Sequence, residues 1–134
     1  MTYQEFFKLL GNPDPICLID NKIKISMNEI NKYNKKNDIY FIPNIGGTKS
    51  KDITDFKVFF VDLDCGRDEN NNYYSLNKVG RFKESCLAKI DNFEIKPNVV
   101  AETRNGLHAY WFIYDKIDYE IWAKIENAFV EHFN

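Results

Sequence analysis

Residues 58–66 read VFFVDLDCG, and this stretch sets the interpretation of the rest of the chain. Apolar and aromatic residues from Val58 to Val61 run directly into Asp62, Leu63 and Asp64. The segment predicts a buried central strand over residues 57–63 that ends in acids. Side chains alternate across a strand, so Asp62 and Asp64 share one face and Leu63 lies on the other.

The acid pair is a candidate metal site. Two carboxylates this close repel each other, and one is driven protonated unless a cation lies between them. Magnesium and manganese bind carboxylate oxygen, and they commonly bind one or two acids together with the phosphates of a substrate. We therefore expect Asp62 and Asp64 to be ligands of Mg²⁺ or Mn²⁺. In the alternative interpretation the strand simply ends at Asp62, and Asp64 caps a polar loop.

The composition predicts one folded, cytoplasmic domain. The chain has 134 residues, of which 44% are hydrophobic and 16% aromatic, and this is enough to bury a core. No apolar run approaches the roughly 18 residues of a membrane-spanning helix, and the start of the chain lacks the features of a signal peptide. We expect no membrane partner. Three cysteines without a CxxC spacing predict neither a disulfide framework nor a zinc site.

The net charge of −2 excludes a protein that is basic overall. Contact with nucleic acid would therefore need a local patch. Lysines cluster in the first half of the chain, and Lys49 and Lys51 are the candidates there for nucleic-acid binding. A cluster of this kind is also compatible with an ordinary solvated face.

Apolar spacing and turn signals predict a mixture of helices and strands. The predicted helices cover residues 3–10, 27–36, 81–93 and 118–133. The predicted strands cover residues 16–26 (two short strands around a turn at Asp20-Asn21), 38–45 (broken by Pro43), 57–63, 98–103 and 107–114. Because these elements do not alternate regularly, we expect an α+β fold with an antiparallel or mixed sheet and flanking helices.

The last two strands form a predicted hairpin with His108 near its turn. Asn105-Gly106 is a pair favoured in tight hairpin turns. Alternation divides the second strand into two faces: His108, Tyr110 and Phe112 on one, and Leu107, Ala109, Trp111 and Ile113 on the other. A single histidine on a strand is often structural, but near an acidic pair it becomes a candidate functional group.

The hairpin offers hydrogen-bond donors for a triphosphate. An imidazole beside metal-bound phosphates can donate to their oxygens, and so can the backbone amides of a glycine turn. Arg104, Asn105 and Gly106 are therefore candidate nucleotide-binding residues together with His108. Glu102 is a further candidate acid, and it shares the face of His108 only if the hairpin register allows.

These segments resemble a known family. The residues FFVDLDCG (59–66), followed by VVAETRNGLHAYWFIY (99–114), resemble the first two motifs of the archaeo-eukaryotic primase superfamily, especially the plasmid and phage primases of its RepB-like and primase-polymerase branches. In that family an apolar strand ends in an Asp-x-Asp metal site, and a later hairpin, typically Ser-Gly-x-Gly-hydrophobic-His, binds the incoming nucleotide. Residues 38–47, DIYFIPNIGG, resemble the preceding strand and loop, and the resemblance covers residues 36–115.

The resemblance implies a primase-polymerase (RRM-like) catalytic core. Asp62 and Asp64 would be the metal ligands, and His108 would contact the triphosphate. The implied reaction is attack of a 3′-hydroxyl on the α-phosphate of a nucleoside triphosphate, on a single-stranded DNA template, in the replication of a plasmid, phage or mobile element. A helicase, as a further domain or a separate protein, is an implied partner.

The chain departs from the family pattern in two ways. Thr103-Arg104 replaces Ser-Gly in the turn, which makes the turn less permissive and adds a cation. The family's third acid lies on a strand beyond the helix that follows the histidine strand, and the sequence ends within that helix; Asp115, Asp118 and Glu120 come too early to match. We therefore expect residues 1–134 to be a single primase-like domain, the N-terminal part of a longer catalytic domain. In the alternative, the polypeptide has lost this third metal ligand.

Two other functions stay open. The chain is alternatively a non-catalytic nucleotide- or DNA-binding module of the same fold that acts in replication initiation. A small glycosyltransferase-like domain also ends a strand in Asp-x-Asp, which holds manganese and a sugar diphosphate, but it has no use for the histidine hairpin. A relaxase or rolling-circle nuclease is disfavoured because the chain has no His-x-His pair.

Overall fold

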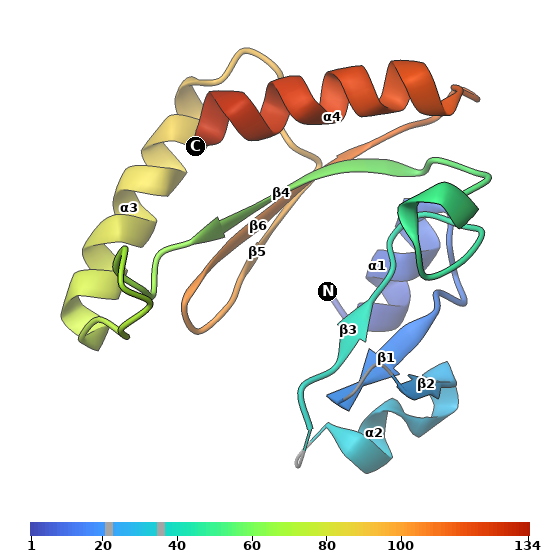
Figure 1. The fold of residues 1–134 in the computed structure, drawn as a ribbon, viewed down its shortest axis with the longest axis horizontal. Helices are drawn as coiled ribbons and strands as arrows, with labels where there is room; N and C mark the ends of the chain where they lie inside the picture. The colour runs from blue at the N-terminus through green and yellow to red at the C-terminus, as the bar shows by residue number, and fades with distance from the viewer. Residues whose placement is uncertain (21–22, 35–36) are drawn as a thin grey trace. The chain divides into compact units, whose positions relative to one another are not determined.

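A computed structural model of the protein describes residues 1–20, 23–34 and 37–134, and these divide into two compact units (Figure 1). Unit 1 contains Met1–Val58 and Ile113–Asp118, and unit 2 contains Phe59–Phe112 and Tyr119–Asn134. Helices mix with two small antiparallel sheets, so the predicted α+β class is confirmed. None of the described helices is long and apolar enough to cross a membrane.

Unit 1 begins with the predicted first helix, α1 (Tyr3–Leu10). A capping box starts it, because the Thr2 hydroxyl accepts the backbone N–H of Glu5 while the Glu5 carboxylate accepts that of Thr2. Gly11 ends it with a φ of 82°, the left-handed conformation that glycine adopts without steric cost. Both ends of α1 are thus set by local sequence.

The sheet of unit 1 has the order β2-β1-β3. The strands are β1 (Cys17–Ile19), β2 (Ile23–Ile25) and β3 (Tyr40–Phe41). β1 and β2 form the predicted pair of short strands, and Asn21 of the turn between them lies outside the described residues. The predicted strand over 38–45 shortens to β3, because Pro43 has no N–H to donate to a ladder.

The remaining elements of unit 1 are short. They are the 3₁₀ turn η2 (Met27–Glu29), the helix α2 (Ile30–Tyr33) and the 3₁₀ turn η3 (Ser50–Asp52). The predicted helix over 27–36 is thus a 3₁₀ turn followed by α2, and residues 35 and 36 lie outside the described part of the chain.

Unit 2 holds residues 59–66 of the segment VFFVDLDCG and the hairpin. Its elements follow the order β4 (Val58–Asp64, whose first residue belongs to unit 1), α3 (Leu76–Asn92), β5 (Val99–Glu102), β6 (Gly106–Phe112) and α4 (Tyr119–Phe133). The sheet order is β4-β6-β5, so the hairpin strand β6 lies between β4 and β5.

The helix α3 starts before the predicted residue 81. Ser75 caps it, with its hydroxyl accepting the backbone N–H of Lys78 at 3.4 Å. Val79 is the one buried side chain in the first turns, among mainly exposed residues. The apolar spacing there is too weak to reveal the helix.

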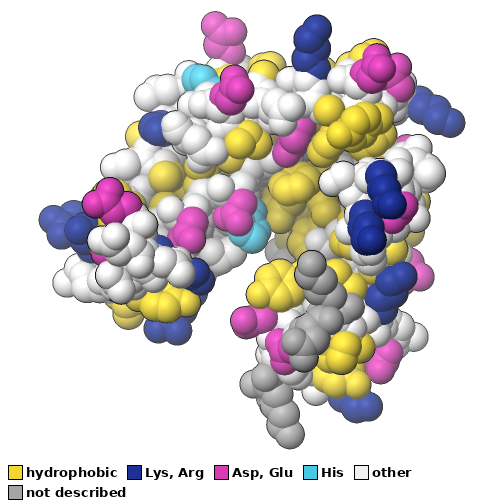
Figure 2. Space-filling model, in the orientation of Figure 1, with side chains coloured by type: hydrophobic (Ala, Val, Ile, Leu, Met, Phe, Trp, Pro, Cys, Tyr) yellow, Lys and Arg dark blue, Asp and Glu magenta, His cyan; other side chains and the backbone are white. Residues whose placement is uncertain are grey.

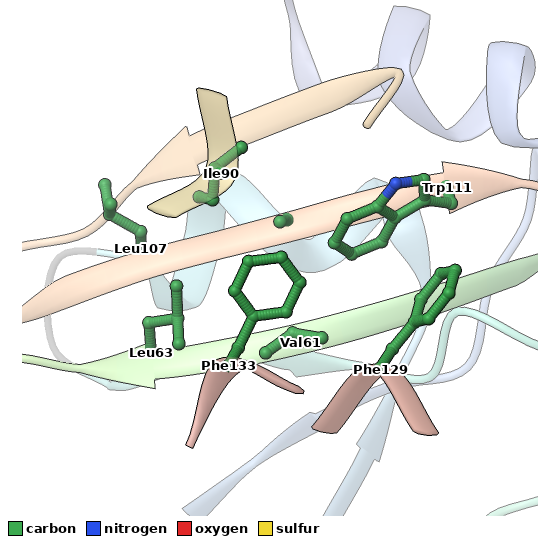
Figure 3. Packing of buried hydrophobic residues seen from close by; sticks show 8 residues of the cluster. Val61, Leu63, Ile90, Leu107, Trp111, Phe129 and Phe133 are labelled. Atoms are coloured by element: carbon green, nitrogen blue, oxygen red, sulfur yellow. The ribbon is translucent and has the colours of Figure 1, made fainter. Parts of the chain in front are cut away.

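The core of unit 2 lies between one face of its sheet and the helices α3 and α4 (Figure 3). Its buried members are Val61, Leu63, Ile90, Leu107, Ala109, Trp111, Phe129 and Phe133. Three of these eight side chains are aromatic, and the ring centroids of Trp111 and Phe129 are 4.8 Å apart. The predicted apolar face of residues 107–111 is therefore the face that packs against the helices.

The helix α4 also protects the outer edge of the sheet. β4 is an edge strand, and the backbone N–H of Phe60 donates to Oε2 of Glu126 at 3.1 Å. Glu126 is buried, and its burial raises its pKa to about 7 against the opposing effect of this hydrogen bond. A side chain thus satisfies a donor that an unpaired edge would leave open.

Candidate functional site

Asp62 and His108 lie in contact on the sheet of unit 2. Nε2 of His108, in β6, is 3.3 Å from Oδ1 of Asp62, in β4. The side chain of His108 is 36% exposed and that of Asp62 is 68% exposed, so the pair is open to a ligand. Figure 2 shows acidic side chains beside a histidine over this sheet. Two residues that the sequence singled out on separate strands are therefore brought together.

Asp64 ends β4 two residues beyond Asp62. It is exposed, whereas Leu63 between the two acids is buried, as alternation predicts. Its Oδ1 accepts the backbone N–H of Gly66 at 2.9 Å. This hydrogen bond caps the loop, as the alternative interpretation of Asp64 predicts. It engages Oδ1 and leaves the second carboxylate oxygen, Oδ2, as a further acceptor. Capping the loop and ligating a cation are compatible roles for Asp64.

The hairpin turn packs against the end of β4. The backbone N–H of Cys65 donates to the carbonyl of Asn105 at 2.7 Å. A Cβ on Gly66 would lie 2.5 Å from Cβ of Asn105, and a Cβ on Gly106 would lie 2.1 Å from the carbonyl oxygen of Leu63. Both glycines therefore permit a close approach between the acid strand and the turn.

The role of Gly106 differs from the predicted one. Gly106 is the first residue of β6 and its carbonyl accepts the N–H of Thr103, so the turn itself falls on Arg104 and Asn105. Gly11 and Gly46 are the described glycines with positive φ, and Gly106 is not among them. The glycine is needed for contact with Leu63 rather than for the conformation of the turn.

The predicted basic residues lie in two different units. Arg104 is exposed at the tip of the hairpin in unit 2. Lys49 and Lys51 are exposed at η3 in unit 1. Arg104 therefore belongs to the same unit as Asp62 and Asp64, whereas Lys49 and Lys51 belong to the other unit.

Glu102 does not join the site, so its interpretation as an acid beside the metal is wrong. The hairpin register pairs Ala101 with His108 and Glu102 with Leu107, which places Glu102 on the face opposite to His108. Its Oε1 is 3.1 Å from Nζ of Lys83, in α3. The sequence left this register open, because the turn length alone does not fix it.

Tyr110 is a site residue to which the sequence assigned no role. Its hydroxyl oxygen is 3.3 Å from Nδ1 of His108. Burial, followed by the negative charge of Asp62, raises the pKa of Tyr110 to about 12. The available signal was the spacing, since His108 and Tyr110 are two residues apart on one strand and share a face.

Two cysteines lie beside the acid strand. The Sγ atoms of Cys65 and Cys86 are 3.5 Å apart. Burial, and then the neighbouring Cys86, raises the pKa of Cys65 to about 12, so its thiol stays neutral next to Asp64. Cys65 therefore adds no negative charge to the acid pair.

The acids suit a cation that arrives with its own further ligands. Among residues 1–20, 23–34 and 37–134, no group of three or more His, Cys, Asp and Glu side chains is assembled to hold a metal. Asp62 and Asp64 offer two carboxylates, which is the number that Mg²⁺ often takes when water and substrate phosphates complete its shell. Carboxylate oxygen is the donor type that Mg²⁺ and Mn²⁺ prefer, so these two residues are the ones that could hold such an ion.

Comparison of the chain with protein-family models, with curated proteins and with solved structures finds no match. The function is therefore inferred from the site and from the resemblance of its two motifs.

Proposed function

We propose that the chain is a primase or primase-polymerase type nucleotidyltransferase domain that acts in the replication of a plasmid, phage or mobile element. The observation that carries the proposal is the contact between Asp62 and His108. The two motifs of the resemblance meet there, at 3.3 Å and open to solvent, although 46 positions of sequence (108 − 62) separate them.

The topology of unit 2 supports the proposal. The order β4-α3-β5-β6-α4, with the sheet order β4-β6-β5, corresponds to the split β-α-β arrangement of ferredoxin-like and RRM-like folds. Both helices pack on one face of the sheet, and Asp62 and His108 lie on the other. This is the arrangement that an RRM-like catalytic core requires, although many functions share the fold.

Each site residue has a role that follows from its chemistry. Asp62 and Asp64 would hold Mg²⁺ or Mn²⁺, which neutralises phosphate charge and makes a 3′-hydroxyl more nucleophilic. His108 would donate from Nε2 to a β- or γ-phosphate oxygen, the same nitrogen that faces Asp62. Arg104, exposed at the turn, would add positive charge toward the phosphates or the template.

Nucleotide binding tests the metal site. We expect a nucleoside triphosphate with Mn²⁺ to raise the melting temperature of the chain, and a nucleotide sugar with Mn²⁺ to have little effect. Replacing Asp62 and Asp64 together by Asn should abolish the triphosphate shift while the protein stays folded. Glu102→Gln is the matched control, because it removes an exposed carboxylate of the same sheet on the opposite face. An undiminished shift in the double variant would remove the metal site from the proposal.

His108→Ala tests the triphosphate contact. We expect a loss of about ten- to a hundredfold in triphosphate affinity, the range of a hydrogen bond to a charged group. Isothermal titration measures it, and nucleoside monophosphate serves as the control ligand because it lacks the β- and γ-phosphates. Equal affinity of wild type and variant for the triphosphate would exclude the assigned role.

A non-catalytic nucleotide-binding module is the second candidate function. It is favoured by the interactions that already engage both acids, the contact of Asp62 with His108 and the hydrogen bond from the backbone N–H of Gly66 to Asp64. Primer synthesis and primer extension on single-stranded DNA separate the two functions. Product that disappears with Asp62→Asn identifies the enzyme, and triphosphate binding without product identifies the module.

A further inference from the structure

Two thiols lie in contact just beyond the end of the acid strand. Sγ of Cys65, the residue after β4, is 3.5 Å from Sγ of Cys86, in α3. Both cysteines are free thiols, and 21 positions of sequence separate them. The proposed function uses neither of them, and the spacing of the cysteines in the sequence gave no reason to pair them.

The two thiols differ in their access to solvent. Cys86 is partly exposed, whereas Cys65 is only 4% exposed. An oxidant in solution therefore reaches Cys86 first, and Cys65 is placed to react with Cys86 from inside the protein. An accessible cysteine with a second thiol beside it is the arrangement of a redox-sensing cysteine and its resolving partner. Cys17, the third cysteine, is fully buried in β1 of unit 1.

We propose that Cys65 and Cys86 are a redox-active pair that forms a reversible disulfide, which links the end of the acid strand to α3. The oxidant is a low-molecular-weight disulfide such as oxidised glutathione. The sulfur of Cys86 attacks it to form a mixed disulfide, and one glutathione leaves with the proton of the Cys86 thiol. The sulfur of Cys65 then attacks Sγ of Cys86, and the second glutathione leaves with the proton of the Cys65 thiol. The two cysteines lose two electrons and two protons in total, and oxidised glutathione gains them.

The fold holds both sulfurs in place before they react. Cys86 packs against the core of unit 2 on the same helix as the buried Ile90. The backbone N–H of Cys65 donates to the carbonyl of Asn105 at 2.7 Å. Both thiols therefore stand on anchored backbone, and the folded chain presents them to each other at a higher effective concentration than the unfolded chain does.

Equilibration of the full chain with mixtures of reduced and oxidised glutathione tests the pairing. Acid quenching, followed by labelling with N-ethylmaleimide in denaturant, lets mass spectrometry count the free thiols. We expect a label on all three cysteines of the reduced protein and on Cys17 alone after oxidation, with a peptide map that joins Cys65 to Cys86. A stable glutathione adduct on Cys86 beside a free Cys65 would overturn the proposal.

Single substitutions test the order of the two steps. We expect Cys65→Ser to accumulate the glutathione adduct on Cys86, and Cys86→Ser to leave the buried Cys65 unmodified. Cys65→Ala repeats the first measurement without placing a polar group in a buried position. Cys17→Ser is the matched control and should form the disulfide as wild type does. Equal adduct formation on Cys65 and Cys86 in the two serine variants would contradict the assigned order.

The same equilibration in urea tests whether the fold prepares the pair. We expect the equilibrium constant for disulfide formation to be about thirtyfold or more larger in the folded chain than in the unfolded one, the lower end for a native disulfide. By the thermodynamic cycle, the disulfide then stabilises the fold by the same factor. Equal constants in the two states would show that the contact does not favour the bond, and would overturn the proposal.

The disulfide also acts on the candidate site. A disulfide bond is shorter than the present contact, so the two sulfurs must approach each other. The backbone of Cys65 lies between Asp64 and the Gly66 N–H that caps it, and it is bonded to the hairpin turn at Asn105. The approach of Cys65 to α3 therefore pulls on both contacts.

Binding of ATP with Mn²⁺ measures this effect, which rests on the function proposed above. We expect oxidation to weaken binding about three- to tenfold, the effect of one hydrogen bond. Cys86→Ser is the control, and its affinity should not respond to the oxidant. If the reduced protein does not bind ATP, the proposed function fails while the thiol counts still decide the disulfide. If both forms bind ATP equally, the effect on the site is excluded and the proposed function stands.

Discussion

Each face of the β4-β6-β5 sheet carries one pair of acidic and basic side chains, and the two pairs have similar geometry. On the side of α3, Lys83 lies 3.1 Å from Glu102, and on the other side His108 lies 3.3 Å from Asp62. Both carboxylates are largely exposed, at 73% for Glu102 and 68% for Asp62. A short contact between an acidic and a basic side chain therefore does not by itself distinguish a functional pair from a structural one.

The second partner of each basic group makes the difference. Lys83 also donates to the carbonyl of Thr103, so its ammonium ties α3 to the backbone of the hairpin. His108 instead contacts the hydroxyl of Tyr110, a side chain of the same strand. The first arrangement fixes two elements to each other, and the second joins two side chains within β6.

The largest expected change in stability comes from a substitution on the face of the sheet that packs against α3 and α4. Trp111→Ala should lower the free energy of unfolding by about 3–5 kcal/mol, because it leaves a cavity beside Phe129 and Phe133 and removes the hydrogen bond from Nε1 to the carbonyl of Ile95. Urea denaturation followed by circular dichroism measures the loss. A change below about 1 kcal/mol would show that this face is not the principal core of unit 2.

Glu126→Gln should give the next largest effect, and the effect should depend on pH. The pKa of Glu126 rises from 4.5 to about 7 on folding, so the folded state binds more protons between these values. The free energy of unfolding of wild type therefore falls as pH rises from about 4.5 to about 7, and is level above. Gln keeps an acceptor for Phe60 without the charge, so the variant should be more stable than wild type by up to about 3 kcal/mol at pH 8 and similar to it at pH 4. Denaturation at both pH values measures this, and equal stability at pH 8 would contradict the assignment.

Gly106→Ala should have an intermediate effect on stability, and it should also weaken ligand binding. Its Cβ would lie 2.1 Å from the carbonyl oxygen of Leu63, so the hairpin must move away from β4. We expect a loss of about 1–3 kcal/mol in stability, together with weaker triphosphate binding because His108 moves from Asp62. Gly80→Ala is the control, since a Cβ there would meet nothing within 4 Å. Equal behaviour of the two variants in denaturation and binding would show that the close approach is not required.

The smallest stability effects should come from the two exposed acids. Glu102→Gln and Asp62→Asn should each change the free energy of unfolding by less than about 1 kcal/mol, because exposed ion pairs contribute little. Their effects on triphosphate binding should differ, with a loss only for Asp62→Asn. Parallel denaturation and titration of the two variants test the comparison, and a loss of binding in both would show that the faces are not functionally distinct.

Local patterns predicted most of the elements. The capping box and Gly11 define α1, and the alternation in VFFVDLDCG gives β4 to within one residue at each end. The interruption at Pro43, after β3, is also a local signal. One error has a local cause: the mainly exposed first turns of α3 conceal its start at Leu76. Helical propensity in a polar segment carries little information without an apolar stripe.

The sequence alone determined that Asp62 and Asp64 share a face and that His108 shares a face with Tyr110, because strand alternation is a property of the backbone. The tertiary structure decided the rest. It placed β6 next to β4, which brings His108 to Asp62, and it chose the hairpin register that sends Glu102 to Lys83. Strand order and register depend on packing between residues far apart in the chain, and no short stretch of sequence contains that information.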